Sequence, residues 1–151
     1  MWKIRNYRIS LDIWGLCLFV AIMMPNFVWL GIPAPNDILR NATETPGLDR
    51  ISFIVQVLTV AAVCLVINRT FHQPVNHFIA MGIALSVVVY LFGWIAYYMG
   101  FTGLPVILTL CISPCAAFLF QTWGKRNGLG FLLALLFLVL HTIRGILNYC
   151  I

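Results

Sequence analysis

The feature that most constrains this chain is a series of five apolar stretches, each about as long as a bilayer core is thick. They cover about residues 10–32, 51–67, 76–99, 104–123 and 129–150. A helix of this length reaches or nearly reaches across the ~30 Å of hydrocarbon. Charged residues make up only 9% of the chain, against about 25% in a soluble domain. We therefore expect an all-α, polytopic transmembrane helical bundle that forms one domain over residues 1–151.

The charges between the apolar stretches predict how the bundle lies in the membrane. Six basic residues against one acidic residue would lie on one side: Lys3, Arg5, Arg8, Arg69, Lys125 and Arg126, against Asp12. The loop over residues 33–50, on the other side, holds Arg40 and Arg50 together with Asp37, Glu44 and Asp49. The positive-inside rule then places the N-terminus in the cytoplasm and the C-terminus outside the cell membrane. No small-residue cleavage site follows the first stretch, so we interpret it as an uncleaved span rather than a signal peptide.

Charge and cysteine content exclude two other classes of protein. The net charge is +5, but the basic residues lie in short loops and form no patch with interleaved aromatic residues, so we expect no nucleic-acid partner. The five cysteines, an odd number, all fall in apolar segments, which is not the pattern of a secreted disulfide framework. Cys111 and Cys115 lie one turn apart, with His141 at similar depth, but their spacing matches no recognised metal motif. We expect no metal site and no cofactor.

Polar side chains inside the last apolar stretch are the strongest functional signal in the chain. His141, Arg144 and Asn148 are spaced at i, i+3 and i+7, so they form one stripe along a helix. Gln56 and Asn26 lie at similar depth in two other spans. A charge inside a membrane costs at least ~2.5–3.5 kcal/mol at the helix centre, so something must compensate it. Three explanations remain open for Arg144: a side chain that extends to lipid phosphate, a salt bridge that stabilises the bundle, and a ligand or ion site.

The acids of the outer loop supply a candidate partner for Arg144. Nearly all the acidic residues of the chain lie above it in that loop. We expect Arg144 to face the bundle interior and to pair with Asp37, with Asp49 as the alternative partner. The hypothetical ligand-binding set is therefore Arg144, His141, Asn148, Asp37, Gln56 and Asn26.

Two shorter patterns predict local packing. The third span carries small residues at helical spacing, which allow close approach of another helix within the bundle or in a dimer: Gly82, Ser86 and Gly93. It ends in an aromatic group that is typical of a membrane-interface belt: Tyr90, Trp94, Tyr97 and Tyr98. Near the start of the first span, Asp12 follows Arg8 by four residues, which predicts a solvated ion pair on one helix face.

The segment "MPNFVWLGIPAPNDILR", from Met24 to Arg40, resembles small, uncharacterised five-span integral membrane proteins of Gram-positive bacteria. The resemblance covers the first quarter of the chain. It implies a bacterial plasma membrane, and it implies no activity.

Three functions fit these observations. The first is a non-enzymatic accessory or regulatory bundle protein that packs against another membrane protein or a second copy of itself, surrounded by membrane lipid. The alternative is a protein that binds or transports a small anionic or lipidic ligand in the outer leaflet, as an oligomer. An enzyme acting on lipid is disfavoured, because the sequence shows no nucleophile and base at a suitable spacing.

Overall fold

The five predicted spans are present as helices. The structure is a computed structural model that describes residues 6–71 and 76–150. Five helices in these residues are long and apolar enough to cross a membrane. They are α1 (Ile13–Gly31), α2 (Pro46–Leu65), α3 (His77–Tyr98), α4 (Leu104–Gly124) and α5 (Gly128–Tyr149). Lys3 and Arg5, on which the predicted orientation partly depends, lie outside the described residues.

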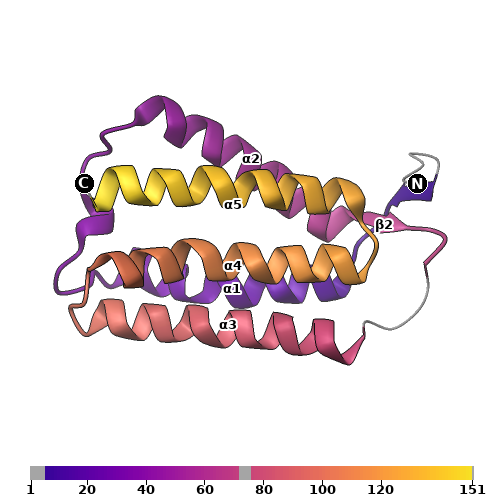
Figure 1. Cartoon of the computed structure of the whole chain (residues 1–151), viewed down its shortest axis with the longest axis horizontal. Coiled ribbons are helices and arrows are strands. Elements are labelled where there is room, and N and C mark those ends of the chain that lie inside the picture. Colours follow the sequence, from indigo (N-terminus) through magenta and orange to yellow (C-terminus); the bar gives the residue numbers. More distant parts are fainter. Residues whose placement is uncertain (1–5, 72–75, 151) are drawn as a thin grey trace.

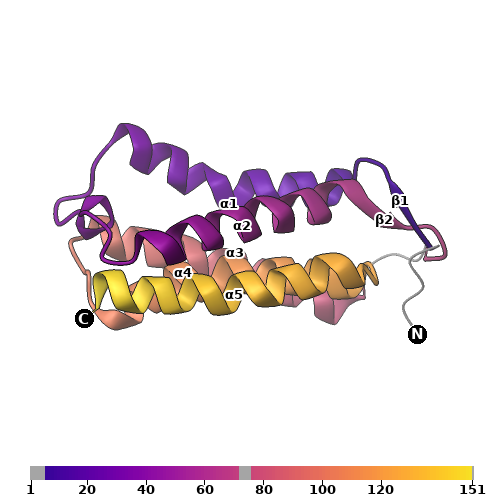
Figure 2. The same ribbon diagram turned by 90° about the horizontal axis from the view of Figure 1, so that it is seen from above.

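The helices run side by side and alternate in direction (Figure 1). α3 packs against α4, α4 against α5, and α5 against α2, while α1 lies along one side of this row (Figure 2). We call one end the strand end, which holds β1 (Tyr7–Ile9), β2 (Val66–Asn68) and the turn between α4 and α5. The opposite end, with residues 32–45 and the last turn of α5, is the loop end.

The all-α prediction misses a small sheet at the strand end. β1 pairs with β2 in antiparallel register, with Tyr7 opposite Asn68 and Ile9 opposite Val66. The sequence predicts that the second span continues through residues 66 and 67, but α2 ends at Leu65. Val66 and Ile67 are β-branched residues, which favour extended backbone, and the pairing with β1 satisfies backbone groups where the helix ends.

The second span begins earlier than predicted. α2 starts at Pro46 rather than near residue 51, and within the predicted outer loop a 3-10 turn, η2 (Ile38–Arg40), precedes it. Proline suits the first turn of a helix because it needs no backbone N–H bond there, and Asp49 interacts favourably with the positive end of the helix dipole. The charges of Asp49 and Arg50 therefore belong to a helix start and not to a loop.

The aromatic group of α3 forms core rather than an interface belt, so that prediction is wrong for three of its four residues. Tyr90, Trp94 and Tyr97 are 3%, 5% and 0% exposed. Trp94 packs edge to face against both tyrosines, with ring centroids 6.3 Å from Tyr90 and 5.7 Å from Tyr97. The three residues are spaced at i, i+4 and i+7, so they share one face of α3, and that face points into the bundle.

The small residues of α3 serve the interior of the bundle. A Cβ atom at Gly82 would lie 3.0 Å from the Phe120 ring, and one at Gly93 would lie 2.9 Å from the Thr109 side chain. Phe120 and Thr109 both belong to α4. The stripe therefore lets α3 approach α4 closely, as expected for one of the two arrangements that the sequence left open.

Candidate functional site

Arg144 forms an ion pair with a carboxylate at the loop end, and that carboxylate is Asp49. The Nε atom of Arg144 donates to Oδ1 of Asp49. The side chains are 27% and 21% exposed, so the pair is partly shielded from its surroundings. The expected pairing with Asp37 is wrong, and the alternative with Asp49 is confirmed.

Two neighbours on α5 and one residue before α2 complete this arrangement, which we call the Arg144 cluster: Arg144, Asp49, Asn148, Tyr149 and Thr45. Asn148 donates through Nδ2 to Asp49 Oδ1 at 3.2 Å and accepts from Thr45 Oγ1 at 3.0 Å. Arg144 donates to Tyr149 Oη at 3.5 Å. The polar atoms of the cluster thus bind one another and connect the start of α2 to the end of α5.

The helix packing explains why Asp49 is the partner. α2 and α5 are antiparallel neighbours, so the first turn of α2 lies beside the last turns of α5 (Figure 1). An acid in a first turn and a base in a last turn each interact favourably with their own helix dipole. The same contact then brings the two opposite charges together without the loop having to fold over the bundle.

Asp37 is the centre of a separate network on the other side of the loop end. Its carboxylate accepts from Trp29 Nε1 at 2.8 Å, from Tyr97 Oη at 2.9 Å and from Arg40 Nε at 2.8 Å. The backbone N–H of Ala34 also donates to it, at 3.3 Å. The side chain is 10% exposed. We call Asp37 with these four donors the Asp37 network.

The charge of Asp37 is therefore already compensated within its own loop. Burial alone would raise the pKa of the carboxyl group, but the bonds from Trp29, Tyr97, Arg40 and Ala34 outweigh burial and leave the pKa below its ordinary value of 3.8. Arg40 also lies over the Trp29 ring, with its Cζ 4.8 Å from the ring centroid. The network fastens η2 to the ends of α1 and α3, and this engagement is the physical reason why Asp37 is not the partner of Arg144.

The other three predicted site residues do not join the Arg144 cluster. Asn26 donates through Nδ2 to Tyr90 Oη at 2.8 Å, which links α1 to α3. The ring of His141 packs against that of Phe137, with centroids 4.9 Å apart. Gln56 is half-buried on α2, and within residues 6–71 and 76–150 its side chain forms no hydrogen bond with another predicted site residue. The predicted polar layer is therefore divided among several helix contacts.

The cysteines of α4 do not assemble a metal site with His141. In the described part of the chain, no group of three or more potential metal ligands lies close together. A Cβ atom at Gly145 would lie 2.6 Å from Cys111 Sγ, so this thiol fills the contact between α4 and α5. All five cysteine thiols are free.

The strand end contains polar contacts that the sequence analysis does not predict. One of them takes the place of a predicted ion pair. Asp12 accepts from the backbone N–H groups of Trp14 and Gly15 at 3.1 and 3.3 Å, so it caps α1. Its other oxygen lies 3.6 Å from Nζ of Lys125. The predicted pair with Arg8 is wrong because Arg8 lies on a strand, where the helical i, i+4 spacing does not apply.

Asn127 holds the strand end together, and sequence reasoning missed it. Its side chain donates to the carbonyl groups of Ala62 and Val66 at 2.8 and 2.9 Å and accepts from Gly130 N–H at 3.0 Å. It is 2% exposed. A signal was available, because asparagine just before an apolar stretch is a preferred helix cap.

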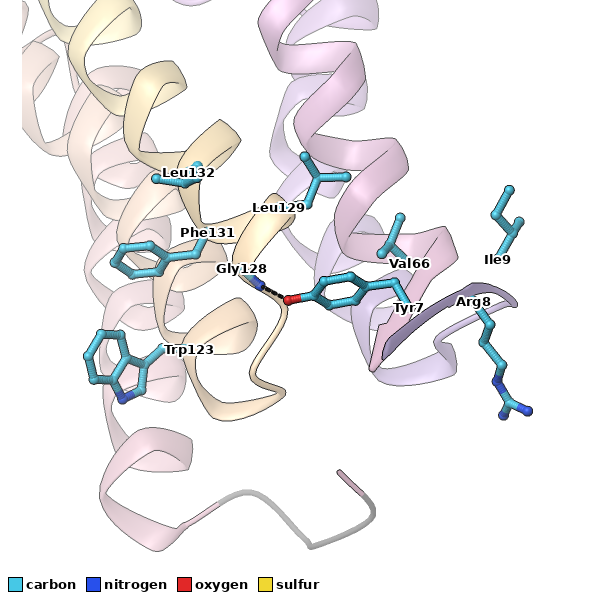
Figure 3. A pocket seen from close by; sticks show the side chains of 9 residues that line it. All are labelled: Tyr7, Arg8, Ile9, Val66, Trp123, Gly128, Leu129, Phe131 and Leu132. Atoms are coloured by element: carbon cyan, nitrogen blue, oxygen red, sulfur yellow. Dashed lines mark hydrogen bonds between the residues drawn. The ribbon is translucent and has the colours of Figure 1, made fainter. Parts of the chain in front are cut away.

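A large apolar pocket lies beside these contacts, with a volume of about 940 Å³. Figure 3 shows residues from β1, β2, α4 and α5 around it. Its lining residues are Tyr7, Arg8, Ile9, Val66, Trp123, Gly128, Leu129, Phe131 and Leu132. Tyr7 Oη accepts from Gly128 N–H at 3.1 Å, which bridges the strand pair and the start of α5.

We compared the chain with known protein families, curated proteins and solved structures. No protein-family profile, curated protein or solved structure matches this chain.

Proposed function

We propose that this chain is a non-enzymatic accessory or regulatory protein of the bacterial plasma membrane, with its strand end in the cytoplasm. The observation that carries the proposal is the Arg144–Asp49 ion pair, with Asn148 bound to the same carboxylate. An intramembrane charge that is compensated within the fold acts as a structural link between helices. The Asp37 network fastens the remainder of the loop end in the same way.

The alternative, an outer-leaflet site for an anionic or lipidic ligand, loses its main support for the same reason. Such a ligand would have to displace Asp49 from Arg144, and would leave a partly buried carboxylate without its partner. The predicted set of ligand-binding residues is also divided, since Asn26 and Asp37 bind other side chains.

Charge supports the proposed orientation. Among the described residues, the strand end holds four basic residues and one acid: Arg8, Arg69, Lys125, Arg126 and Asp12. The loop end holds three basic residues and three acids: Arg40, Arg50, Arg144, Asp37, Glu44 and Asp49. The positive-inside rule places the more basic end in the cytoplasm.

Photo-crosslinking in native membranes tests the accessory role. A benzophenone amino acid replaces one exposed apolar side chain on each helix in turn: Phe27, Phe53, Phe92, Ile112 and Leu136. We expect protein adducts from one helix or two neighbouring helices, because a partner covers a continuous surface. The remaining positions then act as controls that crosslink to lipid. Lipid adducts alone at all five positions would overturn the proposal.

A further inference from the structure

The strand-end pocket, with a volume of about 940 Å³, is a feature that the proposed function leaves unexplained. It is bounded by the start of α5 and the end of α4 on one side and by β1 and β2 on the other (Figure 3). The Tyr7 ring spans the distance between the two sides. Because its hydroxyl accepts from Gly128 N–H and donates to the Arg126 carbonyl group at 3.4 Å, the two walls are held at a defined separation.

The walls of the pocket are apolar and open to the surroundings. Leu129 and Leu132 on α5 are 51% and 66% exposed, and Trp123 on α4 is 61% exposed. Side chains of this kind gain from contact with a hydrocarbon chain. They lie in the first turns of α5 and the last turn of α4, two helices that are long and apolar enough to cross a membrane. The pocket therefore lies where the acyl region of a bilayer gives way to the headgroups.

The rim of the pocket carries positive charge. Among the described residues, Arg8 is the one charged residue of the lining. Figure 3 shows its side chain pointing away from the Ile9 side chain and away from the bodies of the helices. Within the described residues, no carboxylate lies within ion-pair distance of Arg8, because the three ion pairs present join other residues.

The rest of the strand end adds further positive charge. Lys125 and Arg126 belong to the neighbouring turn between α4 and α5, and Arg69 follows β2. The acid of this end, Asp12, is paired with Lys125. An apolar wall at the more basic end of the bundle is complementary to an amphiphile with a long hydrocarbon chain and an anionic headgroup, and basic pockets between membrane helices bind such headgroups.

We propose that the strand-end pocket binds one anionic glycerophospholipid. Its acyl chain lies against Leu129, Phe131 and Leu132, and its phosphate group lies beside Arg8. A zwitterionic lipid has the same acyl chains and phosphate, but its ammonium group is repelled by the surrounding basic residues. The site stands on its own geometry and charge, and it does not depend on the accessory role.

Native mass spectrometry of the full chain tests this site. The protein in mild detergent receives equal amounts of phosphatidylglycerol and phosphatidylcholine with identical acyl chains. We expect one bound phosphatidylglycerol, preferred over phosphatidylcholine. Arg8→Gln should lower the preference about fivefold. Arg50→Gln is the matched control, because Arg50 is an exposed arginine at the loop end, and it should leave the preference unchanged.

A second pair of variants tests the apolar wall. Leu132→Trp fills the pocket and should reduce binding of both lipids, whereas Leu136→Trp, one turn further along α5 and outside the lining, should not. Unchanged thermal unfolding shows that each variant is folded. Three results would each overturn the site: equal binding of the two lipids by the unaltered chain, a preference that survives Arg8→Gln, or binding that survives Leu132→Trp. Occupation of the pocket by a second copy, seen as a dimer that Leu132→Trp dissociates, would also overturn it.

Discussion

Replacing Asp37 with alanine should weaken the fold more than any other single change of an acidic residue in this chain. The substitution removes a carboxylate that accepts from Trp29, Tyr97, Arg40 and the backbone of Ala34. Alanine can adopt the same backbone conformation as Asp37, and its side chain is smaller. Its effect therefore reports on the Asp37 network alone.

The burial of each donor sets the size of the effect. Tyr97 is 0% exposed, so its hydroxyl group cannot reach water once the carboxylate is gone, which costs about 1–3 kcal/mol. The half-buried Trp29 indole adds about 1 kcal/mol. The Arg40 side chain is 41% exposed and recovers its hydration, so its share stays below about 1 kcal/mol. The expected loss for Asp37→Ala is about 2–4 kcal/mol in the free energy of unfolding.

Reversible unfolding in mixed micelles, followed by tryptophan fluorescence, measures this loss. Glu44→Ala is the matched control, because Glu44 is an exposed acid of the same loop whose side chain forms no ion pair within the described residues. The control should change stability by less than about 0.5 kcal/mol. If Asp37→Ala and Glu44→Ala have equal effects, the network does not stabilise the loop end and the reasoning is refuted.

The remaining predictions concern the Arg144 ion pair, the protonation of Asp37 and the fit of α1 against α2. Arg144→Ala and Asp49→Ala should each cost about 1–3 kcal/mol, and the double variant should cost clearly less than their sum in the same unfolding assay; strict additivity would show that the pair contributes nothing. Because the pKa of Asp37 is lower in the folded protein than its ordinary value of 3.8, the folded state binds this proton more weakly. The contribution of Asp37 to stability should therefore be complete above about pH 4 and be lost as the pH falls through the folded-state pKa. When the free energy of unfolding is measured against pH, this decrease at acidic pH should be absent in the Asp37→Ala variant. Gly15→Ala should lower the melting temperature, since its Cβ atom would meet a backbone carbonyl group of α2, whereas Gly31→Ala, with open space around it in the same helix, should not.

The number of helices long and apolar enough to cross a membrane could be predicted because it depends on local composition alone. Five apolar stretches of sufficient length need no knowledge of the fold, and each appears as a helix. The end of the second stretch could not be predicted in this way. Val66 and Ile67 are apolar, and apolar residues fit a continued helix as well as a strand. Their extended conformation depends on pairing with Arg8 and Ile9, which lie nearly 60 residues earlier in the chain.

The partner of Arg144 shows the same limit for the candidate site. The sequence indicated that an outer acid would compensate this charge, but the choice between Asp37 and Asp49 depends on which helices are neighbours. α2 lies beside α5, so Asp49 is within reach. The engagement of Asp37 by Trp29 and Tyr97 depends on contacts between α1, the loop and α3 that no local pattern reveals.

One error could have been avoided from the sequence. The clustering of Tyr90, Trp94 and Tyr97 near the end of a span favours a membrane interface. Their i, i+4 and i+7 spacing is the pattern of a single helix face, and a belt of interfacial residues has no reason to follow one face. The spacing was the better guide, since all three side chains are buried.

The orientation of the two ends is most directly tested by cysteine accessibility. Glu44→Cys at the loop end and Arg69→Cys at the strand end introduce exposed thiols, each in a chain that also carries Cys150→Ser. A membrane-impermeant maleimide is added to intact spheroplasts and, separately, to permeabilised ones. A bundle with an odd number of crossings and a cytoplasmic strand end predicts that position 44 reacts in both samples and position 69 only after permeabilisation. Reaction of both positions in intact spheroplasts, or of position 69 alone, would contradict it.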